Sequence, residues 1–330
     1  MTATGGGIGR LGKEVGAVGL GCWAIGGHFL FDGKPDGWGL VDDAESVRAI
    51  HRAIDLGVTL FDTADVYGTG HSERVLGQAL KGRRDGVLIA TKFGYAYDES
   101  RREITGTDLS PGYVRRACLA SLARLGTDYL DLYQLHVGVV EPGVADDLLA
   151  ALEDLVDEGL IRSYGWSTDE PDAIRRLAGR RGAAAAQFRL NVLSGSTEAL
   201  AACEESDLTG LARTPLAMGL LTGKYDAGSR LPADDVRGSG HSWVEYFHDG
   251  RPDAGYLERL AAVREILTSD GRTLAQGALG WIMARSPRVV PIPGFKSVAQ
   301  AEENAGAIAR GPLTAAQMAE IDALLDPQPA

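Results

Sequence analysis

An apolar run ends on Asp62, and a tyrosine follows five residues later, in the stretch Phe61-Asp62-Thr63-Ala64-Asp65-Val66-Tyr67-Gly68. Two later stretches also end or nearly end an apolar run with a polar residue: Leu88-Ile89-Ala90-Thr91-Lys92-Phe93-Gly94 and Leu130-Asp131-Leu132-Tyr133-Gln134-Leu135-His136. Burying a lone Asp, Lys or His costs several kcal/mol unless the group is paired. Because helical patterns separate the three stretches, we expect their polar ends to meet in one shared site.

Strand and helix patterns alternate along the chain. After an apolar segment at 15–20, the expected strands are 58–61, 87–91, 129–135, 161–165, 184–188, 208–212 and 289–292. The expected helices are 47–54, 72–80, 113–125, 145–158, 171–177, 196–204, 256–267, 274–283 and 298–309. This alternation predicts an α/β fold, a single (β/α)₈ TIM barrel domain over residues 1–330, with a short N-terminal hairpin and a long loop after strand seven.

A doubly wound open sheet is the competing architecture. We favour the barrel because the candidate polar residues follow several different strands, as barrel active sites require, whereas an open sheet gathers its site at one switch point. Residues 226–252 interrupt the alternation with a polar stretch, and loops of that length are usually lids or binding loops.

Composition limits the function classes. The 330 residues are 45% hydrophobic and 24% charged, with a formal net charge of −12, which disfavours nucleic acid or an anionic membrane as main partner. Three widely spaced cysteines indicate neither a disulfide framework nor a zinc site. The N-terminus has no apolar signal segment and no stretch reaches membrane-spanning length, so we expect a cytoplasmic protein. The Ala, Gly and Arg content resembles a GC-rich bacterial source, and a homo-oligomer stays possible.

One string imitates a dinucleotide fingerprint. Gly7-Ile8-Gly9-Arg10-Leu11-Gly12 matches G-x-G-x-x-G, but only six residues precede it, and Gly16 and Gly19 interrupt the segment after it. Since the motif needs a strand before it and a helix after it, we interpret this string as a glycine-permitted hairpin.

The four polar groups form a set suited to moving a proton at a carbonyl. Tyr67 would donate the proton, Lys92 would lower the pKa of that phenol, Asp62 would hold Lys92, and His136 would polarise the carbonyl. Each residue alone is also compatible with a structural role: a turn cap, a half-buried ring, a snorkelling lysine or a satisfied core histidine.

The ordered strings of this chain resemble the aldo-keto reductase family from about Gly19 to Asn304. They are Gly19-Leu20-Gly21-Cys22-Trp23, Phe61-Asp62-Thr63-Ala64 with Tyr67-Gly68-x-Gly70 and Glu73, Thr91-Lys92-Phe93-Gly94, Tyr164-Gly165-Trp166-Ser167, Gln187-x-x-x-Asn191, Pro215-Leu216-Ala217-Met218-Gly219-Leu220-Leu221-Thr222-Gly223-Lys224-Tyr225 and Ile292-Pro293-Gly294 ahead of Glu303-Asn304. The resemblance implies reversible NADPH-dependent carbonyl reduction without a metal, with Asp62, Tyr67, Lys92 and His136 as the catalytic tetrad.

The resemblance also implies cofactor contacts. Ser167 and Gln187 would hold the nicotinamide carboxamide, although Thr168 stands where the family usually has Asn. Arg213 occupies the position of a ring that commonly stacks on the nicotinamide, and a planar guanidinium can stack as well. The remaining nicotinamide and pyrophosphate contacts would be Gly21, Trp23, Pro215, Leu216, Gly219 and Lys224, the last of which is equally compatible with a solvated loop lysine.

The adenosine end would lie at 294–304. Glu303 and Asn304 resemble the pair that reads the adenine amino group, and Gly294 precedes them. Lys296 and Ser297 suit a 2′-phosphate, so we favour NADPH over NADH. Gln300 stands where strict NADPH users often have a basic residue, which leaves NADH as the alternative.

The substrate side is less defined. Trp23, Tyr95, Trp243, Tyr246 and Phe247 are candidates for a pocket wall that suits sugars and aryl carbonyls, while the last three could instead form a packed loop core. His28 and His71 are possible residues of the pocket mouth.

Two other functions stay open. One is a cofactor-sensing subunit of the potassium-channel regulatory type, which binds NADPH with little turnover. The other is a metal-dependent barrel hydrolase or isomerase, for which His136 is the only histidine at a strand end.

Overall fold

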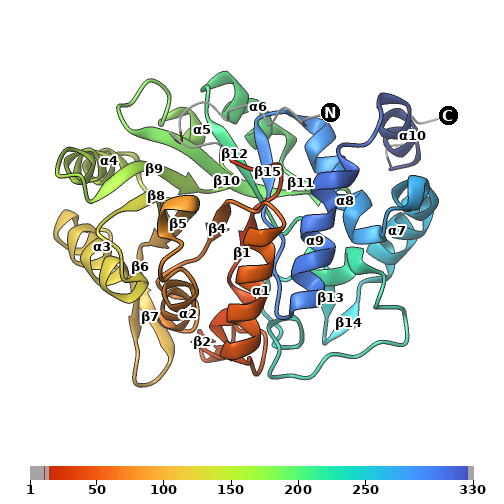
Figure 1. Cartoon of the computed structure of the whole chain (residues 1–330), viewed down its shortest axis with the longest axis horizontal. Coiled ribbons are helices and arrows are strands. Elements are labelled where there is room, and N and C mark those ends of the chain that lie inside the picture. The colour runs from red at the N-terminus through yellow and green to blue at the C-terminus, as the bar shows by residue number, and fades with distance from the viewer. Residues whose placement is uncertain (1–10, 12–14, 326–330) are drawn as a thin grey trace.

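The computed structural model describes residue 11 and residues 15–325. Parallel strands pair in the order of the sequence around a barrel (Figure 1). They are β1 (Leu20–Gly21), β4 (Leu60–Asp62), β5 (Leu88–Phe93), β8 (Leu130–Leu135), β9 (Ile161–Ser167), β10 (Ala183–Asn191), β12 (Thr209–Arg213) and β15 (Val289–Pro291). The barrel prediction is confirmed over the open sheet. The predicted N-terminal hairpin and the Gly7–Gly12 string, apart from Leu11, lie outside the described residues.

Backbone contacts between β15 and β1 close the barrel. The amide of Gly19 donates to the carbonyl of Pro291 over 3.0 Å, and that of Gly21 donates to Pro293 over 2.9 Å. Gly21 and Gly294 also form a parallel bridge. A Cβ atom on Gly21 would lie 2.9 Å from the carbonyl oxygen of Ile292, so this seam requires glycine.

Helices cover the outside of the barrel. They are α1 (Asp43–Asp55), α2 (His71–Ala79), α3 (Pro111–Leu125), α4 (Pro142–Asp157), α5 (Pro171–Arg175), α6 (Thr197–Glu205), α7 (Ala254–Leu267), α8 (Leu274–Arg285), α9 (Val298–Arg310) and α10 (Ala315–Leu325). Helices α1 and α9 lie side by side across the closing seam in Figure 1. Short 3₁₀ turns are η1 (Ala24–Gly26), η2 (Arg84–Gly86), η3 (Ala217–Thr222), η4 (Val236–Gly238) and η5 (Ser269–Gly271).

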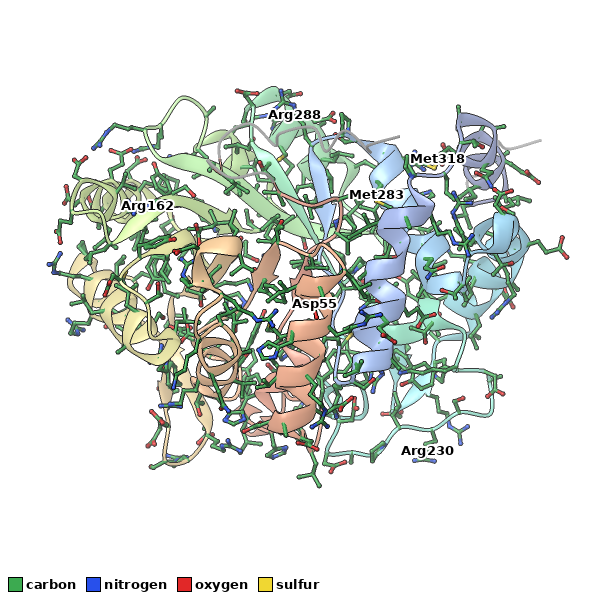
Figure 2. All side chains as sticks on the ribbon, in the orientation of Figure 1. Asp55, Arg162, Arg230, Met283, Arg288 and Met318 are labelled. Atoms are coloured by element: carbon green, nitrogen blue, oxygen red, sulfur yellow. The ribbon has the colours of Figure 1, made fainter. Side chains whose placement is uncertain are left out.

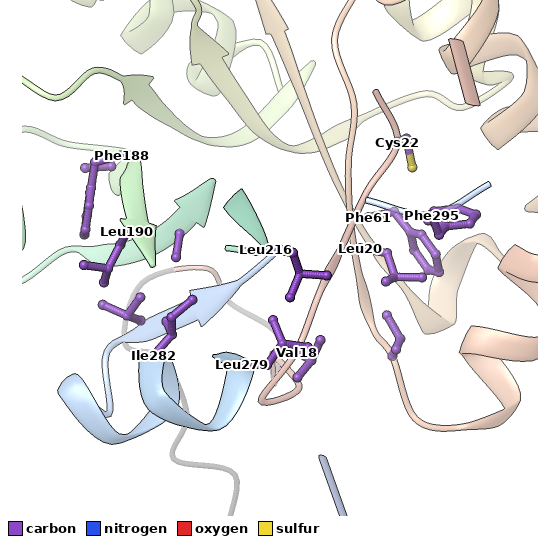
Figure 3. Close-up of a cluster of buried hydrophobic side chains, with 14 of the residues drawn as sticks. Val18, Leu20, Cys22, Phe61, Phe188, Leu190, Leu216, Leu279, Ile282 and Phe295 are labelled. Atoms are coloured by element: carbon purple, nitrogen blue, oxygen red, sulfur yellow. The ribbon is translucent and has the colours of Figure 1, made fainter. Parts of the chain in front are cut away.

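Apolar side chains fill both surfaces of the strands. Figure 3 shows strand residues Leu20, Phe61 and Phe188 in one hydrophobic cluster with Leu279 and Ile282 of α8. A separate cluster of small and branched residues fills the barrel interior, and its members are Leu11, Val15, Leu60, Leu88, Ala90, Leu132, Ala184, Ala185, Leu211, Val290 and Ile292. The interior is therefore a packed core, and a binding site is left to the carboxyl end of the strands.

Short strands outside the barrel surround that carboxyl end. A second sheet has the order β3 (Lys34–Pro35), β2 (Leu30–Phe31), β7 (Glu103–Thr107), β6 (Tyr95–Asp98). The ribbon of β13 (Phe247–His248) and β14 (Arg251–Pro252) lies within the long loop 226–252, and β11 (Ser194–Gly195) extends β10. Arg230 of the long loop and Arg288, just before β15, lie at opposite ends of the molecule in Figure 2. Within the described chain, no helix combines the length and apolar character needed to cross a membrane.

Candidate active site

Lys92 lies at the centre of a buried hydrogen-bond chain. Its ammonium donates to Asp62 Oδ2 over 2.6 Å, to the carbonyl of Thr63 over 2.8 Å and to the hydroxyl of Tyr67 over 3.1 Å. The lysine is fully buried, and its three N–H donors are all used. Burial lowers the pKa of Lys92, but the carboxylate of Asp62 and the phenol of Tyr67 raise it more, so its pKa lies above the usual value. The side chain is therefore a permanent cation at neutral pH.

The other oxygen of Asp62 accepts two amide hydrogen bonds. Gln187 Nε2 donates over 2.8 Å and Gln134 Nε2 over 3.0 Å. The carboxylate is thus held on both oxygens by three strands of the barrel, which fixes Lys92 in turn. Gln187 was expected to hold a nicotinamide carboxamide, yet its amide nitrogen also donates to Gln134 Oε1 over 3.2 Å. Its nitrogen is therefore committed to the Asp62 network.

A close turn after β4 positions the Tyr67 hydroxyl. The amide of Tyr67 donates to the carbonyl of Ala64, and Gly68 adopts a left-handed φ of 60°. A Cβ atom on Gly68 would lie 1.9 Å from the carbonyl oxygen of Gly26, so only glycine allows this approach. The backbone next to the tyrosine is therefore packed directly against η1.

The phenol of Tyr67 is not acidified in the way we expected. Burial raises its pKa above the usual 10.0, and the lowering effect of Lys92 does not offset this fully because Asp62 acts in the opposite sense. Lys92 lowers the pKa of the phenol, as we expected, but burial raises it more, so the pKa of Tyr67 is not brought below its ordinary value. At neutral pH Tyr67 is a neutral phenol with its proton available for donation.

His136 is a neutral imidazole beside Tyr67. Burial, with the charges of Lys92 and Arg213, holds its pKa well below the usual 6.5. Its ring contacts the rings of Tyr67 and Tyr95 edge-on, with centroids 5.7 and 5.3 Å away. Its buried Nδ1 has no hydrogen-bond partner among the described residues. Because the neutral ring lines the cavity, it is suited to a hydrogen bond with a bound molecule.

Asp62, Tyr67 and His136 line a cavity of about 790 Å³. Four of the five aromatic residues that we predicted for a pocket wall also line it: Trp23, Tyr95, Trp243 and Tyr246. Phe247 does not line the cavity: it is buried and contacts Tyr225 edge-on at 5.4 Å, so its placement in the pocket wall was wrong.

Neither histidine suggested for the mouth lines the cavity. His71 is the first residue of α2, and its ring hydrogen bonds to Asp43 over 2.9 Å. His28 lies in the segment before β2 and is not among the lining residues.

The cavity extends from the tetrad to both proposed cofactor segments. The lining residues that we predicted there are Gly21, Ser167, Thr168, Gln187, Arg213, Pro215, Leu216, Gly219, Lys224, Gly294, Lys296, Gln300, Glu303 and Asn304. Ser297 does not line it, because its hydroxyl caps α9 by accepting from the amide of Gln300 over 3.3 Å. A serine before an apolar helical pattern is an N-cap signal that was available in the sequence.

Two predicted cofactor residues have local partners. Arg213 forms an ion pair with Asp169, which restricts the guanidinium that was expected to stack on a nicotinamide. Thr168 stands where the family usually has Asn, and its hydroxyl donates to the carbonyl of Gly138 over 2.7 Å. The hydroxyl therefore points to the backbone.

The segment 214–219 has an irregular backbone and contributes to the cavity wall. Its residues with left-handed φ are Thr214 (50°), Ala217 (48°), Met218 (53°) and Gly219 (95°). The amides of Ala217 and Gly219 donate to the carbonyls of Thr214 and Leu216 within the segment. Lys224 and Lys296 border the same cavity, and neither forms an ion pair within the part of the chain that is described. The residues that line this part of the cavity therefore fit a cofactor that carries phosphate and has at least two negative charges.

The sequence did not reveal several polar and aromatic residues of this cavity, among them Asp36, Trp38, Asp169 and Arg237. Arg237 is buried, makes a bidentate pair with Asp235, and donates to the carbonyl of Met218 over 3.1 Å. These residues lie in loops without periodicity, so no hydrophobic pattern marks them. Of these four residues, Arg237 alone lies in the loop 226–252, whose length suggested a lid or binding loop.

A parallel eight-strand barrel with a Tyr–Lys–Asp–His set at its carboxyl end defines a class of carbonyl oxidoreductases. Residues 17–326 match the model of the Aldo/keto reductase family, and the chain belongs to that family of NAD(P)H-dependent oxidoreductases. It is 32% identical over 308 residues to the aldo-keto reductase yakc of Schizosaccharomyces pombe, whose name includes NADP(+), with 91% of this chain and 86% of that protein covered.

Solved structures give the same result. A glycerol dehydrogenase from Gluconobacter oxydans superposes with a TM-score of 0.79 at 29% identity, covering 98% of this chain and 96% of the other. An aldo-keto reductase from Klebsiella pneumoniae in complex with NADPH superposes with a TM-score of 0.66 at 28% identity, covering 96% and 93%. The family resemblance drawn from the sequence is confirmed.

Proposed function

We propose that the protein reduces an aldehyde, ketone or sugar carbonyl to the alcohol with NADPH, reversibly, and that Tyr67 donates the proton. The observation that carries this proposal is the Asp62–Lys92–Tyr67 hydrogen-bond chain beside a cavity that Lys224 and Lys296 also line. A bound reduced nicotinamide supplies the hydride. All other groups that the reaction needs belong to this chain.

Each tetrad residue has one task in this proposal. His136, a neutral ring that lines the cavity, hydrogen bonds the carbonyl oxygen and orients it toward Tyr67. Tyr67 gives its proton to the oxygen as negative charge develops there, and Lys92, 3.1 Å away, stabilises the phenolate that remains. Asp62 keeps Lys92 in position and does not transfer a proton. In the alcohol-to-carbonyl direction the phenolate accepts the proton.

NADPH rather than NADH is supported by the two cavity lysines without acidic partners. The ammonium of Lys296 uses one donor for the carbonyl of Trp38 at 2.7 Å, which leaves two donors for a 2′-phosphate. NADP(+) in the name of the yeast relative and NADPH in the Klebsiella structure agree with this preference.

Aromatic residues around the tetrad support an organic carbonyl substrate, and the glycerol dehydrogenase among the structural relatives supports polyols and sugars in particular.

The test is a steady-state comparison of NADPH and NADH oxidation with aryl aldehydes, aliphatic ketones and aldoses, with the alcohol product identified by chromatography. We expect stoichiometric alcohol and a kcat/KM for NADPH at least about tenfold that for NADH, since a tenfold ratio needs only about 1.4 kcal/mol. Tight NADPH binding without any alcohol product would refute the proposal and favour a cofactor-sensing role.

A further inference from the structure

A buried carboxyl group lies in the cavity wall without a role in the tetrad. Asp36 is 8% exposed and lines the cavity, and its Oδ1 has no hydrogen-bond partner among the described residues. An unsatisfied buried oxygen costs free energy in the empty protein. The side chain nevertheless keeps 11% of its surface exposed and lines the cavity, so a ligand can contact the carboxyl group from that side.

The surroundings of Asp36 are aromatic. Trp23 contacts Trp38 edge-on at 5.2 Å and Trp243 at 6.0 Å, and all three indoles line the same cavity as the carboxyl group. His241 stacks on Trp243, and its Nε2 lies 3.5 Å from Asp36 Oδ1, which is too long for a good hydrogen bond. The carboxyl group therefore lies in a mainly aromatic part of the cavity wall, with Arg237 on the ring of Trp38 at 4.7 Å.

Two titratable groups at this wall, Asp36 and His241, are mainly uncharged at neutral pH. Burial, with a contribution from Asp32, raises the pKa of Asp36 to about 8, and burial lowers the pKa of His241 below its usual value. A neutral carboxylic acid can both donate and accept a hydrogen bond, as a hydroxyl group does. An uncharged hydroxyl is thus a better match than a cation.

Backbone hydrogen bonds hold Asp36 in place from several elements. Its amide donates to the carbonyl of Phe29 over 2.9 Å, and the indole N–H of Trp23 donates to its carbonyl over 3.0 Å. The next residue, Gly37, accepts from the amide of Val236 in the long loop over 2.9 Å. A polar group fixed in this way is preorganised for binding.

Trp23 connects this carboxyl group to the proposed reaction centre. Its ring stacks against the ring of Tyr67 with centroids 6.0 Å apart, while its N–H is bonded to the Asp36 backbone. A substrate whose carbonyl reaches Tyr67 would therefore lie along the indole and present its far end to Asp36.

We propose that Asp36 is a specificity-determining residue, which hydrogen bonds a hydroxyl group of the substrate at the end remote from the carbonyl. The preferred substrates are then hydroxylated carbonyl compounds rather than purely hydrocarbon ones. This inference rests on the proposed carbonyl reduction at Tyr67 and narrows its substrate class.

The test uses near-isosteric substrates that differ by a hydroxyl: the meta and para isomers of hydroxymethylbenzaldehyde against the corresponding ethylbenzaldehydes. For the full-length wild type we expect a higher kcat/KM for at least one hydroxymethyl isomer. Asp36→Leu should reduce that preference by about tenfold, the worth of one hydrogen bond, and change kcat/KM for the ethyl compound less than threefold. Asp36→Asn keeps a donor and an acceptor, and it should restore most of the preference.

A binding measurement keeps this test independent of turnover. The corresponding alcohols, benzenedimethanol and ethylbenzyl alcohol, are titrated by calorimetry into the enzyme saturated with NADPH, which cannot oxidise them. The same tenfold loss of preference in Asp36→Leu, with a wild-type melting temperature, supports the inference. An unchanged preference in kinetics and in binding overturns it. Failure of the wild type to reduce any aldehyde, with the Asp36-dependent binding preference retained, would refute the proposed function and leave the hydroxyl site intact.

Discussion

At the scale of single residues, Lys92 accounts for why the tetrad could be predicted. It is a charged side chain in a strand that is buried on both faces, and such a residue needs partners close in space. The same reasoning applied to Asp62 and His136, because each interrupts an apolar pattern. Asp36 and Arg237 escaped prediction because they interrupt no pattern: each lies in a polar, glycine-rich stretch where a charged residue is ordinary. Their burial comes from tertiary contacts alone.

The depressed pKa of His136 predicts a specific acid sensitivity. The unfolded chain takes up this proton near pH 6.5, whereas the folded protein does so only at much lower pH. The unfolded state therefore binds more protons in this window. The contribution of His136 to the free energy of unfolding is fully present above pH 6.5 and falls as pH decreases, by up to about 1.4 kcal/mol per pH unit.

His136→Gln removes this titration, so the variant should lose less stability than the wild type between pH 6.5 and pH 5. Urea unfolding at pH 8.0, 6.5, 5.8 and 5.0 gives the difference curve directly. Parallel curves for the two proteins would mean that the imidazole titrates with an ordinary pKa in the folded state.

At the scale of elements, the periodicity predicted the barrel strands and most helices, and the structure shifts their ends by a few residues. Hairpin β6–β7, the ribbon β13–β14 and helix α10 were not predicted. The two hairpins have strands of two to five residues, too short for alternation to stand out from loop sequence. Helix α10 packs against α7 and α8, but Ile321 is the one residue that it buries fully, so its apolar pattern gave a weak signal.

Helical glycines show what periodicity cannot reveal. Gly277 in α8 packs on the end of α7, where an added Cβ would lie 1.9 Å from the carbonyl oxygen of Leu267. Gly143 in α4 has no atom within 4 Å of such a Cβ. The two glycines look alike in the sequence, and only the packing distinguishes them.

We therefore predict that glycine-to-alanine substitutions at these two positions have opposite effects on the free energy of unfolding. Gly277→Ala should lower the free energy of unfolding by about 3 kcal/mol because the helices must separate. Gly143→Ala should raise it by about 0.5 kcal/mol, since alanine favours the helix and restricts the unfolded chain. Guanidinium unfolding monitored by circular dichroism measures both. Equal effects would show that the α7–α8 contact is looser than described.

At the scale of the whole molecule, Arg237 joins segments that are far apart in sequence. Its guanidinium pairs with Asp235, donates to Tyr225 and lies over the ring of Trp38 at 4.7 Å. Lys296, beyond β15, donates to the carbonyl of Trp38. The loop 226–252, the segment before α1 and the segment after β15 are thus connected above one cavity.

Arg237→Met should loosen this connection, because it leaves Asp235 buried without its partner. We expect faster chymotryptic cleavage within 226–252, at Trp243, Tyr246 or Phe247, and about tenfold weaker binding of NADPH, with the far-ultraviolet circular dichroism unchanged. Arg230→Met, an exposed change on the same loop, is the matched control. Wild-type proteolysis and NADPH affinity in Arg237→Met would show that the loop is held by other contacts.

The central claim is that the Tyr67 hydroxyl donates the proton, and one measurement addresses it most directly. Single-turnover stopped-flow oxidation of NADPH by an aldehyde is compared in the wild type, Tyr67→Phe and Tyr133→Phe. Tyr133 is a matched control because it is fully buried, its hydroxyl has no hydrogen-bond partner among the described residues, and it does not line the cavity. We predict at least a ~10²-fold slower reaction in Tyr67→Phe, wild-type rates in Tyr133→Phe and unchanged NADPH affinity in both. A wild-type rate in Tyr67→Phe would contradict the account.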